Sequence, residues 1–284
     1  MDSGTVRLFD EMAGDYDRLE PWYAHLYDVL HGLVGDWLAP PDGRRRRALD
    51  AGCGTGYQSA ILAAHGYLTH GVDVSTRLLA VARDRLPGVA LVRATVERLP
   101  YPPEAFDVVC CCGSTLSFVA EPERAVAEMA RVLRPGGLLL LECEHAWSLD
   151  VLWSVADALS GGRLGYGLRR AEAWRLLARR PSAGCVVRYP GYGAIRLFTM
   201  SELASMLGAA GLAVERARGI HMATNLIPST VLHRPRLGRG LAAAFRALAA
   251  LDGALRRLPG THRLANSLVV LARKRPPAAP AALR

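Results

Sequence analysis

Several common features are missing from this chain of 284 residues. No apolar run approaches the ~20 residues that a membrane-spanning helix needs, and the polar, acidic N-terminus lacks the apolar centre of a signal peptide. The six cysteines form no CxxC pair and show no metal-ligand spacing, so we expect no metal site. Most of them sit in apolar, strand-like runs, which indicates reduced, packed thiols in a cytoplasmic protein.

Lysine is nearly absent as well, because Lys274 is the single lysine among 35 basic residues. Up to Asp150 the chain holds 14 arginines and 21 acidic residues, a balance of −7; from Val151 it holds 21 basic and five acidic residues, a balance of +16. An arginine-rich composition alone is weak evidence for nucleic-acid binding, which we do not expect. The asymmetry nevertheless sets the two halves apart.

The first half alternates short apolar runs with helical stretches, which predicts βαβ units and a parallel sheet buried on both faces. We expect strands at 47–52, 68–74, 89–94, 106–112 and 138–143, and helices at 56–65, 77–86 and 121–133. After His145 this rhythm breaks. It returns where Thr199 and Glu202 have the spacing of a capping box, and a strand is expected at 213–221.

These patterns predict a core with two insertions. The expected division is an N-terminal helical lid at 1–46, a core at 47–145, a cap insertion at 146–197, a core helix and sixth strand at 198–221, a second cap insertion at 222–264, a last core strand at 265–275 and a disordered tail at 276–284.

The segment "LDAGCGTG" places three glycines, Gly52, Gly54 and Gly56, after the first expected strand. Such a tight turn into a helix needs residues that tolerate positive φ. The segment fails the G-x-G-x-x-G dinucleotide pattern in both registers and has no Walker A lysine. A phosphate-binding role is therefore not indicated.

Two acidic residues flank this glycine loop. Asp50 ends the first strand, where it would repel a pyrophosphate and attract an ammonium or sulfonium group. Asp73 ends the second strand about 20 residues on, a position suited to binding ribose hydroxyls. The pattern therefore favours a cationic nucleoside, and S-adenosylmethionine is the obvious one.

Four ordered motifs resemble those of class I S-adenosylmethionine-dependent methyltransferases: "LDAGCGTG", "GVDVS", "ATVERLPYPPEAFDVV" and "RVLRPGGLLLLE". The general plan is similar to quinone-biosynthesis methyltransferases in the small-molecule branch. This resemblance implies an α/β, Rossmann-like, doubly wound, mostly parallel seven-stranded sheet with an antiparallel last strand, and here the insertions would form a helical cap.

The resemblance also implies which residues hold the cofactor. The glycines would line its methionine part, Asp73 and Val74 the ribose and adenine, and the stretch from Cys112 to Ser114 would face the methionine moiety. Thr95 stands where family members often carry an acid, so Val96 or Glu97 would contact adenine instead. The expected cofactor-binding set is Tyr16, Asp50, Gly52, Cys53, Gly54, Gly56, Asp73, Val74, Thr95, Val96, Glu97 and Cys112.

Methyl transfer mainly requires alignment of the acceptor, and a general base is needed only if the acceptor holds its proton near neutral pH. His145 and His221, each at the end of a strand, are our catalytic candidates, and Glu144 is a third.

The insertions carry the only clues to the acceptor. Their aromatic residues and arginines suit a small amphipathic or acidic organic molecule, such as a secondary metabolite, quinone-like or lipid-like acceptor. The aromatic residues are Trp147, Trp153, Tyr166, Trp174, Tyr189 and Tyr192. Leucines at helical spacing over 237–258 predict either packing on the core or a partner, as in a homodimer, or contact with an anionic membrane surface.

Two other functions are kept open. An RNA or protein methyltransferase would use the basic second half, although "CCGSTLSF" differs from the signature for base amines. A non-catalytic S-adenosylmethionine-binding protein would have the same cofactor loop.

Overall fold

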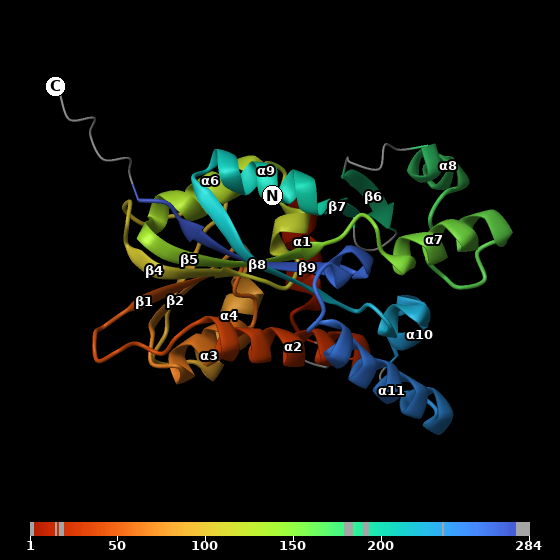
Figure 1. Ribbon diagram of the computed structural model, residues 1–284, viewed down its shortest axis with the longest axis horizontal. Coiled ribbons are helices and arrows are strands. Elements are labelled where there is room, and N and C mark those ends of the chain that lie inside the picture. The colour runs from red at the N-terminus through yellow and green to blue at the C-terminus, as the bar shows by residue number, and fades with distance from the viewer. Residues whose placement is uncertain are drawn as a thin grey trace.

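The computed structural model describes residues 3–14, 16, 20–178, 184–189, 193–234 and 236–276. Of the expected disordered tail at 276–284, only residue 276 is described. Tyr192 also lies outside the described residues. Within them, one seven-stranded sheet forms the middle of the molecule and helices cover both of its faces (Figure 1).

The strand order of this sheet is β3-β2-β1-β4-β5-β9-β8. The first five strands pair in parallel, and β9 runs antiparallel to both of its neighbours. This confirms the predicted fold class. The strands are β1 (Arg47–Ala51), β2 (Leu68–Asp73), β3 (Ala90–Arg93), β4 (Phe106–Cys111), β5 (Leu133–Glu144), β8 (Leu212–Ile220) and β9 (Ser267–Lys274).

The apolar strands are explained by burial on both faces. Along β4, Val109 and Cys111 pack in the cluster beneath α6 (Pro122–Val132) and α9 (Met200–Ala209). Val108 and Cys110 point to the opposite cluster, beneath α2 (Pro21–Trp37) and α3 (Tyr57–Ala64). A strand covered on both sides has no solvent face, so its sequence shows no polar alternation.

The two insertions extend from one end of the sheet (Figure 1). The first contains α7 (Leu149–Ser160), α8 (Arg170–Ala178) and a hairpin of β6 (Cys185–Tyr189) and β7 (Gly193–Leu197). The second contains η1 (Thr224–Leu226), α10 (Ser229–Leu232), α11 (Arg239–Leu255) and η2 (Thr261–Leu264). The hairpin was not predicted from the sequence.

Two buried contacts join the insertions to each other. The Asp150 carboxylate accepts hydrogen bonds from Tyr166 Oη and from the Ser229 backbone N–H and hydroxyl. Trp153 donates its indole N–H to the Asn225 carbonyl oxygen over 3.1 Å. Segments 79 residues apart are therefore held together beyond the end of the sheet.

The predicted cap of α9 is present at its N-terminus. Thr199 Oγ1 accepts a hydrogen bond from the Glu202 backbone N–H at 3.2 Å. The Glu202 carboxylate accepts from the Gly184 backbone N–H and from Arg196. This carboxylate thus ties the core helix to the hairpin of the first insertion.

Candidate cofactor and catalytic site

The glycine loop joins β1 to α3 and is held against β2. The backbone N–H groups of Gly52 and Cys53 both donate to the Val72 carbonyl oxygen, at 2.7 and 3.0 Å. Gly52 has a φ of +85°, and a Cβ at this position would collide with the Thr115 side chain. Both the backbone angle and the close approach of Thr115 therefore require glycine here.

Asp73 fixes the loop through hydrogen bonds at the end of β2. Its Oδ2 accepts from the Gly54 backbone N–H at 2.9 Å, and its Oδ1 accepts from the Ser75 backbone N–H at 2.8 Å. Burial raises the pKa of the Asp73 carboxyl, although these backbone hydrogen bonds oppose the shift. Asp73 thus sets the geometry of the loop and of the start of α4 (Thr76–Arg85) together.

Asp50 lies behind the same loop and is almost fully buried. Its Oδ2 accepts a hydrogen bond from the Ser59 hydroxyl at 2.6 Å, whereas its Oδ1 has no hydrogen-bond partner among the described residues. Burial raises the pKa of Asp50 to about 7, against the lowering effect of Ser59. A nearby cation would lower the pKa of Asp50 again, because it stabilises the ionised carboxylate.

A pocket opens between the loop and the N-terminal segment. Asp73 is the single charged side chain in its lining, so the described wall offers no cation to a phosphate. The lining residues are Phe9, Tyr16, Tyr27, Gly52, Cys53, Gly54, Thr55, Tyr57, Gln58, Asp73, Val74, Leu78, Ala94, Val96, Cys112, Gly113 and Thr115.

The N-terminal segment covers this pocket, and Phe9 of α1 (Ser3–Met12) and Tyr16 both line it. The carboxylate of Asp10 anchors α1 by accepting from the Ser75 hydroxyl at 2.5 Å. Tyr27 of α2 stacks on Tyr57 with ring centroids 5.0 Å apart. Aromatic rings therefore form much of the wall opposite the loop.

Eight of the twelve residues expected to hold the cofactor line the pocket: Tyr16, Gly52, Cys53, Gly54, Asp73, Val74, Val96 and Cys112. Asp50, Gly56, Thr95 and Glu97 do not. Thr95 Oγ1 donates to Glu97 Oε2 at 2.9 Å, and Glu97 Oε1 accepts from the Glu121 backbone N–H at 2.9 Å. These two side chains thus support the turn that presents Val96 to the pocket.

Other lining residues were missed by sequence reasoning. Thr55, Gln58 and Thr115 lie next to predicted positions, so extending the motifs by one or two residues would have included them. Tyr27 had no such signal, because its role depends on how α2 packs over the sheet.

Neither predicted catalytic histidine lines this pocket. His145 is buried, and its Nδ1 lies 2.9 Å from the Ala265 carbonyl oxygen. This contact joins the end of β5 to the segment that precedes β9. Because a carbonyl can only accept, the neutral ring carries its proton on Nδ1.

His221 is fully buried and its imidazole stacks on Trp22, with centroids 3.6 Å apart and planes 6° apart. Burial holds the pKa of His221 well below its usual value. Its backbone φ is +56°, which is rare for a residue other than glycine. His221 is therefore a neutral group packed beneath α2.

A pair of carboxylates lies nearer the pocket, next to its lining residue Gly113. The Ser114 backbone N–H donates to Glu142 Oε2 at 2.6 Å, and the Ser114 hydroxyl donates to Glu144 Oε1 at 2.8 Å. Asn266 donates to Glu144 Oε2 at 2.9 Å. Burial, and then repulsion from Glu142, raise the pKa of Glu144 to about 8.

The comparisons with known proteins agree with this geometry. A family described as "Methyltransferase domain" matches residues 49–141. The chain is 34% identical over 146 residues to a phosphatidylethanolamine N-methyltransferase of Cereibacter sphaeroides, covering 48% of this chain and 71% of that one. The chain belongs to the class I S-adenosylmethionine-dependent methyltransferases.

The chain is also similar to a malonyl-[acyl-carrier protein] O-methyltransferase of Serratia marcescens. It is 32% identical over 159 residues, which are 56% of this chain and 60% of the relative. The chain thus spans less than two thirds of the length of this relative. A solved structure from Thermotoga maritima, described as a possible histamine N-methyltransferase, shares the fold with a TM-score of 0.55 and 19% identity. The match covers 95% of this chain and 99% of that one.

The pocket fits the cofactor of this family. S-adenosylmethionine combines an adenosine with a sulfonium and an ammonium, and the wall combines apolar and aromatic side chains with an ionisable carboxylate. The Asp73 carboxyl lies in this wall and the Asp50 carboxyl is buried behind the loop, so the acidic groups present match a positively charged ligand in sign.

The aromatic residues of the two insertions differ in their exposure to solvent. Tyr166 is buried, and Trp153 and Tyr189 are half-buried. Trp147 and Trp174 are exposed at 41% and 62%. The cap therefore presents part of its apolar surface to solvent.

Proposed function

We propose that the protein transfers the methyl group of S-adenosylmethionine to a small amphipathic organic acceptor. The observation that supports cofactor use is the charge of the pocket: one lining carboxylate, a second buried carboxylate behind the loop, and no cationic side chain in the described lining. Such a site favours a cationic nucleoside over a nucleotide phosphate.

In this proposal the expected residues hold the cofactor in three regions. Asp73 accepts hydrogen bonds from the ribose hydroxyls, and Val74 and Val96 contact adenine. The glycine loop and Cys112 contain the methionine part, and Asp50 faces its ammonium group. Tyr16 closes over the bound cofactor from the N-terminal segment.

We infer that Glu144 is the strongest candidate for a general base, with His145 and His221 as the other candidates. Glu144 is partly exposed and lies one hydrogen bond from Ser114, next to the pocket lining. A carboxyl with a raised pKa can take a proton from an acceptor whose own pKa is not far above neutral. His145 and His221 lie behind other side chains and outside the pocket lining.

The surface of the two insertions supports an acceptor with a long apolar part. Of the large hydrophobic side chains that are exposed in the described residues, all but Leu68 and Val214 lie in these insertions. The exposed set is Trp147, Leu152, Leu159, Trp174, Leu177, Val186, Leu226, Leu251, Leu258 and Leu264. Their concentration in these two segments supports contact with an apolar partner.

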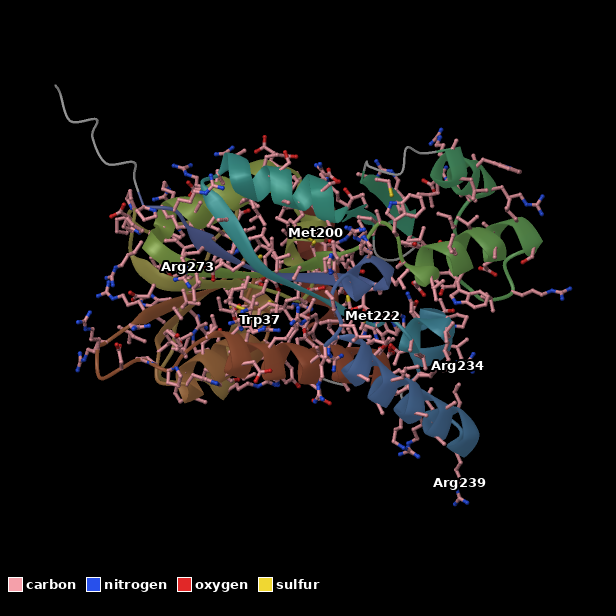
Figure 2. All side chains as sticks on the ribbon, viewed as in Figure 1. Trp37, Met200, Met222, Arg234, Arg239 and Arg273 are labelled. Atoms are coloured by element: carbon pink, nitrogen blue, oxygen red, sulfur yellow. The ribbon has the colours of Figure 1, made fainter. Side chains whose placement is uncertain are left out.

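We propose that the second insertion contacts an anionic membrane through the stretch 237–258. Only Phe245 and Asp252 of α11 are buried, and of its leucines Leu251 is exposed whereas Leu241, Leu248 and Leu255 are half-buried. Arg239 extends from the outer end of α11, away from the sheet (Figure 2). Arginines beside exposed leucines suit a helix lying on anionic headgroups. Among the described residues, no helix is long and apolar enough to cross a membrane.

The test is methyl incorporation from tritiated S-adenosylmethionine into lipid, water-soluble metabolite, RNA and protein fractions of a cell extract. We expect label in the organic-soluble fraction with the wild-type protein and a strong reduction with Asp73→Ala. Label confined to RNA or protein would overturn the acceptor class. Cofactor binding by calorimetry without any transfer would indicate a non-catalytic binding protein. If a second copy of the chain covers α11 in solution, the proposed membrane contact would be wrong and α11 would be a homodimer interface.

A further inference from the structure

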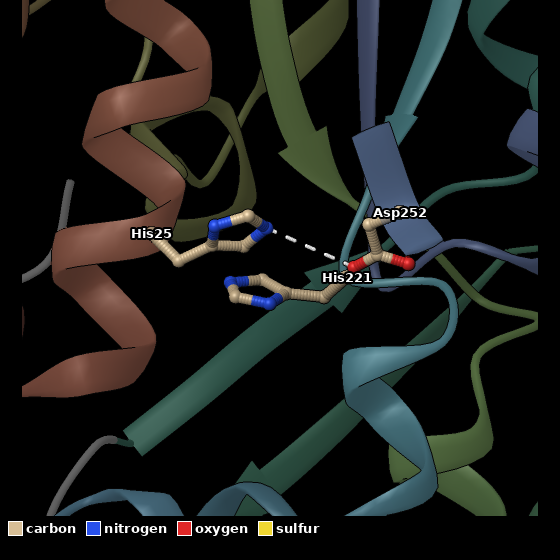
Figure 3. A group of neighbouring side chains, drawn as sticks. All are labelled: His25, His221 and Asp252. Atoms are coloured by element: carbon tan, nitrogen blue, oxygen red, sulfur yellow. Dashed lines mark ion pairs between the residues drawn. The ribbon is translucent and has the colours of Figure 1, made fainter. Parts of the chain in front are cut away.

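Three potential metal ligands from distant parts of the chain meet beneath the second insertion (Figure 3). His25 comes from α2, His221 follows β8 and Asp252 comes from α11. One ligand atom of each residue lies within 4.8 Å of those of the other two. Nε2 of His25 lies 3.8 Å from Asp252 Oδ2, which is too long for a hydrogen bond.

Both histidines have a shielded ring nitrogen that is not satisfied by the described protein. Nε2 of His25 and Nε2 of His221 are inaccessible to solvent and have no hydrogen-bond partner among the described residues. Buried polar atoms are nearly always paired, because leaving one unpaired costs about 1–3 kcal/mol. Two such atoms beside a carboxylate therefore need an explanation.

The tautomer of His221 suits a metal ligand. Thr224 Oγ1 donates its proton to Asp252 Oδ2 at 2.6 Å, so it can only accept from His221 Nδ1, which lies 3.0 Å away. The neutral ring of His221 thus carries its proton on Nδ1 and a lone pair on Nε2. A ligating histidine commonly donates its other N–H in this way.

The Asp252 carboxylate and the His221 ring are both held in place by neighbouring groups before any ion binds. Asp252 accepts hydrogen bonds from the Ala223 backbone N–H and from Thr224. The stacking of Trp22 on His221 fixes the plane of that ring. Such supporting contacts reduce the reorganisation that ion binding requires.

We propose that His25, His221 and Asp252 bind a divalent transition-metal ion, with Zn²⁺ as the best match. Two imidazoles and one carboxylate suit zinc and its neighbours, whereas Mg²⁺ and Ca²⁺ prefer sites built from oxygen ligands. With bonds of ~2.1 Å, tetrahedral ligands lie roughly 3.4 Å apart, so the side chains close in by about 1 Å on binding.

The ion has a structural role in this proposal. None of its three ligands lines the cofactor pocket. Asp252 is one of the two residues of α11 that are buried, so the ion ties this projecting helix to α2 and to the end of β8. The site goes beyond the proposed methyl transfer and does not depend on the acceptor.

The experiment uses the full chain, stripped with EDTA and titrated with Zn²⁺ by calorimetry and with Co²⁺ by visible absorption. We expect one ion per chain, the d–d bands of four- or five-coordinate Co²⁺, and a higher melting temperature with Zn²⁺. His25→Gln should weaken binding by at least ~100-fold, since removal of supporting contacts alone costs 10–100-fold. It should also abolish the thermal shift.

The matched control is His31→Gln. His31 lies on the same helix, is half-buried and also has an unpartnered Nε2, but it faces Tyr27 and Tyr57. This variant should bind the ion as the wild type does. Equal binding by His25→Gln, or no stoichiometric binding by the wild type, would overturn the proposal.

A measurement on the wild type alone removes any doubt about variant folding. X-ray absorption of the Zn²⁺-loaded chain should show imidazole nitrogens and a carboxylate oxygen around the ion. Sulfur ligands would overturn the assignment, because they would place the ion at one of the six cysteines, of which Cys185 is the only one that is not buried.

Discussion

Asp50 and Asp73 flank the same loop, but their hydrogen bonds differ. Asp73 uses both oxygens to hold backbone N–H groups, whereas Asp50 has one oxygen without a protein partner among the described residues. Removal of Asp73 should therefore disturb geometry as well as charge, and removal of Asp50 should change mainly charge.

Asp73→Ala should weaken S-adenosylmethionine binding by about 1.5–3 kcal/mol, the range for hydrogen bonds to a charged group, or roughly 10–150-fold in affinity. Calorimetric titration measures this change. Asp107→Ala is the control, because Asp107 also accepts from a backbone N–H, that of Arg47, but at the opposite end of the sheet. The control should lower stability and leave affinity unchanged; unchanged affinity in Asp73→Ala would refute the ribose assignment.

Asp50 predicts a pH dependence of cofactor affinity. Its pKa without cofactor is about 7, so the carboxyl is mostly protonated below pH 7 and ionised above it. A cationic ligand favours the ionised form, so affinity should rise with pH between about 5.5 and 7.5, by up to tenfold per unit, and then level off. Asp50→Asn should flatten the profile measured by calorimetry, and a wild-type profile already flat would contradict this electrostatic role.

Glu144 predicts a pH dependence of the transfer rate. The group acts as a base only when ionised, and its pKa is raised to about 8, so kcat should increase as pH rises through about 8. Glu144→Gln should lower kcat by roughly 10²–10⁴-fold and leave the KM for the cofactor nearly unchanged. A variant with the wild-type kcat and the same pH profile would exclude Glu144 as the base.

At the scale of elements, the sequence predicted the core strands well and the cap poorly. The central strands β4 and β9 are buried on both faces, so each is a nearly continuous apolar run that is visible in the sequence, whereas the edge strands β3 and β8 are partly exposed. The hairpin of β6 and β7 has five residues per strand and a weak alternation, because it packs mainly on α7 and α8. Its position depends on tertiary contacts that no local pattern encodes.

The site residues were likewise predictable only where they lie close together in the sequence. The loop and its acids are local in sequence, and their geometry follows from a strand, a turn and a helix. Tyr27 comes from a helix that packs across the sheet. The cluster of His25, His221 and Asp252 is spread over more than 220 residues, so no spacing rule could detect it.

The exposed face of α11 predicts membrane association. A double variant, Leu251→Glu with Leu258→Glu, should lose binding to anionic vesicles in a sedimentation assay, because both side chains are about half exposed, Leu251 on α11 and Leu258 three residues beyond its end. Its stability should stay within about 0.5 kcal/mol of the wild type, as expected for surface positions. The control is Leu68→Glu, because Leu68 is also exposed but begins β2, outside both insertions. This variant should bind vesicles normally, and equal binding by the two variants would argue against α11 as the membrane surface.

At the scale of the whole molecule, charge and function divide along the chain. The segment up to Asp150, with its net negative charge, contains every lining residue of the cofactor pocket, and the net positive segment after it supplies most of both insertions. A cationic donor and an anionic surface would thus be attracted to different parts of the same protein.

The position of β9 affects how the chain folds during synthesis. Its residues are made last among the strands, yet they pair with β5 on one side and β8 on the other. Until they leave the ribosome, β5 has an open edge and β8 has no partner in the sheet. The nascent protein therefore depends on β9 to protect an aggregation-prone edge, and chaperone demand should fall once β9 has left the ribosome.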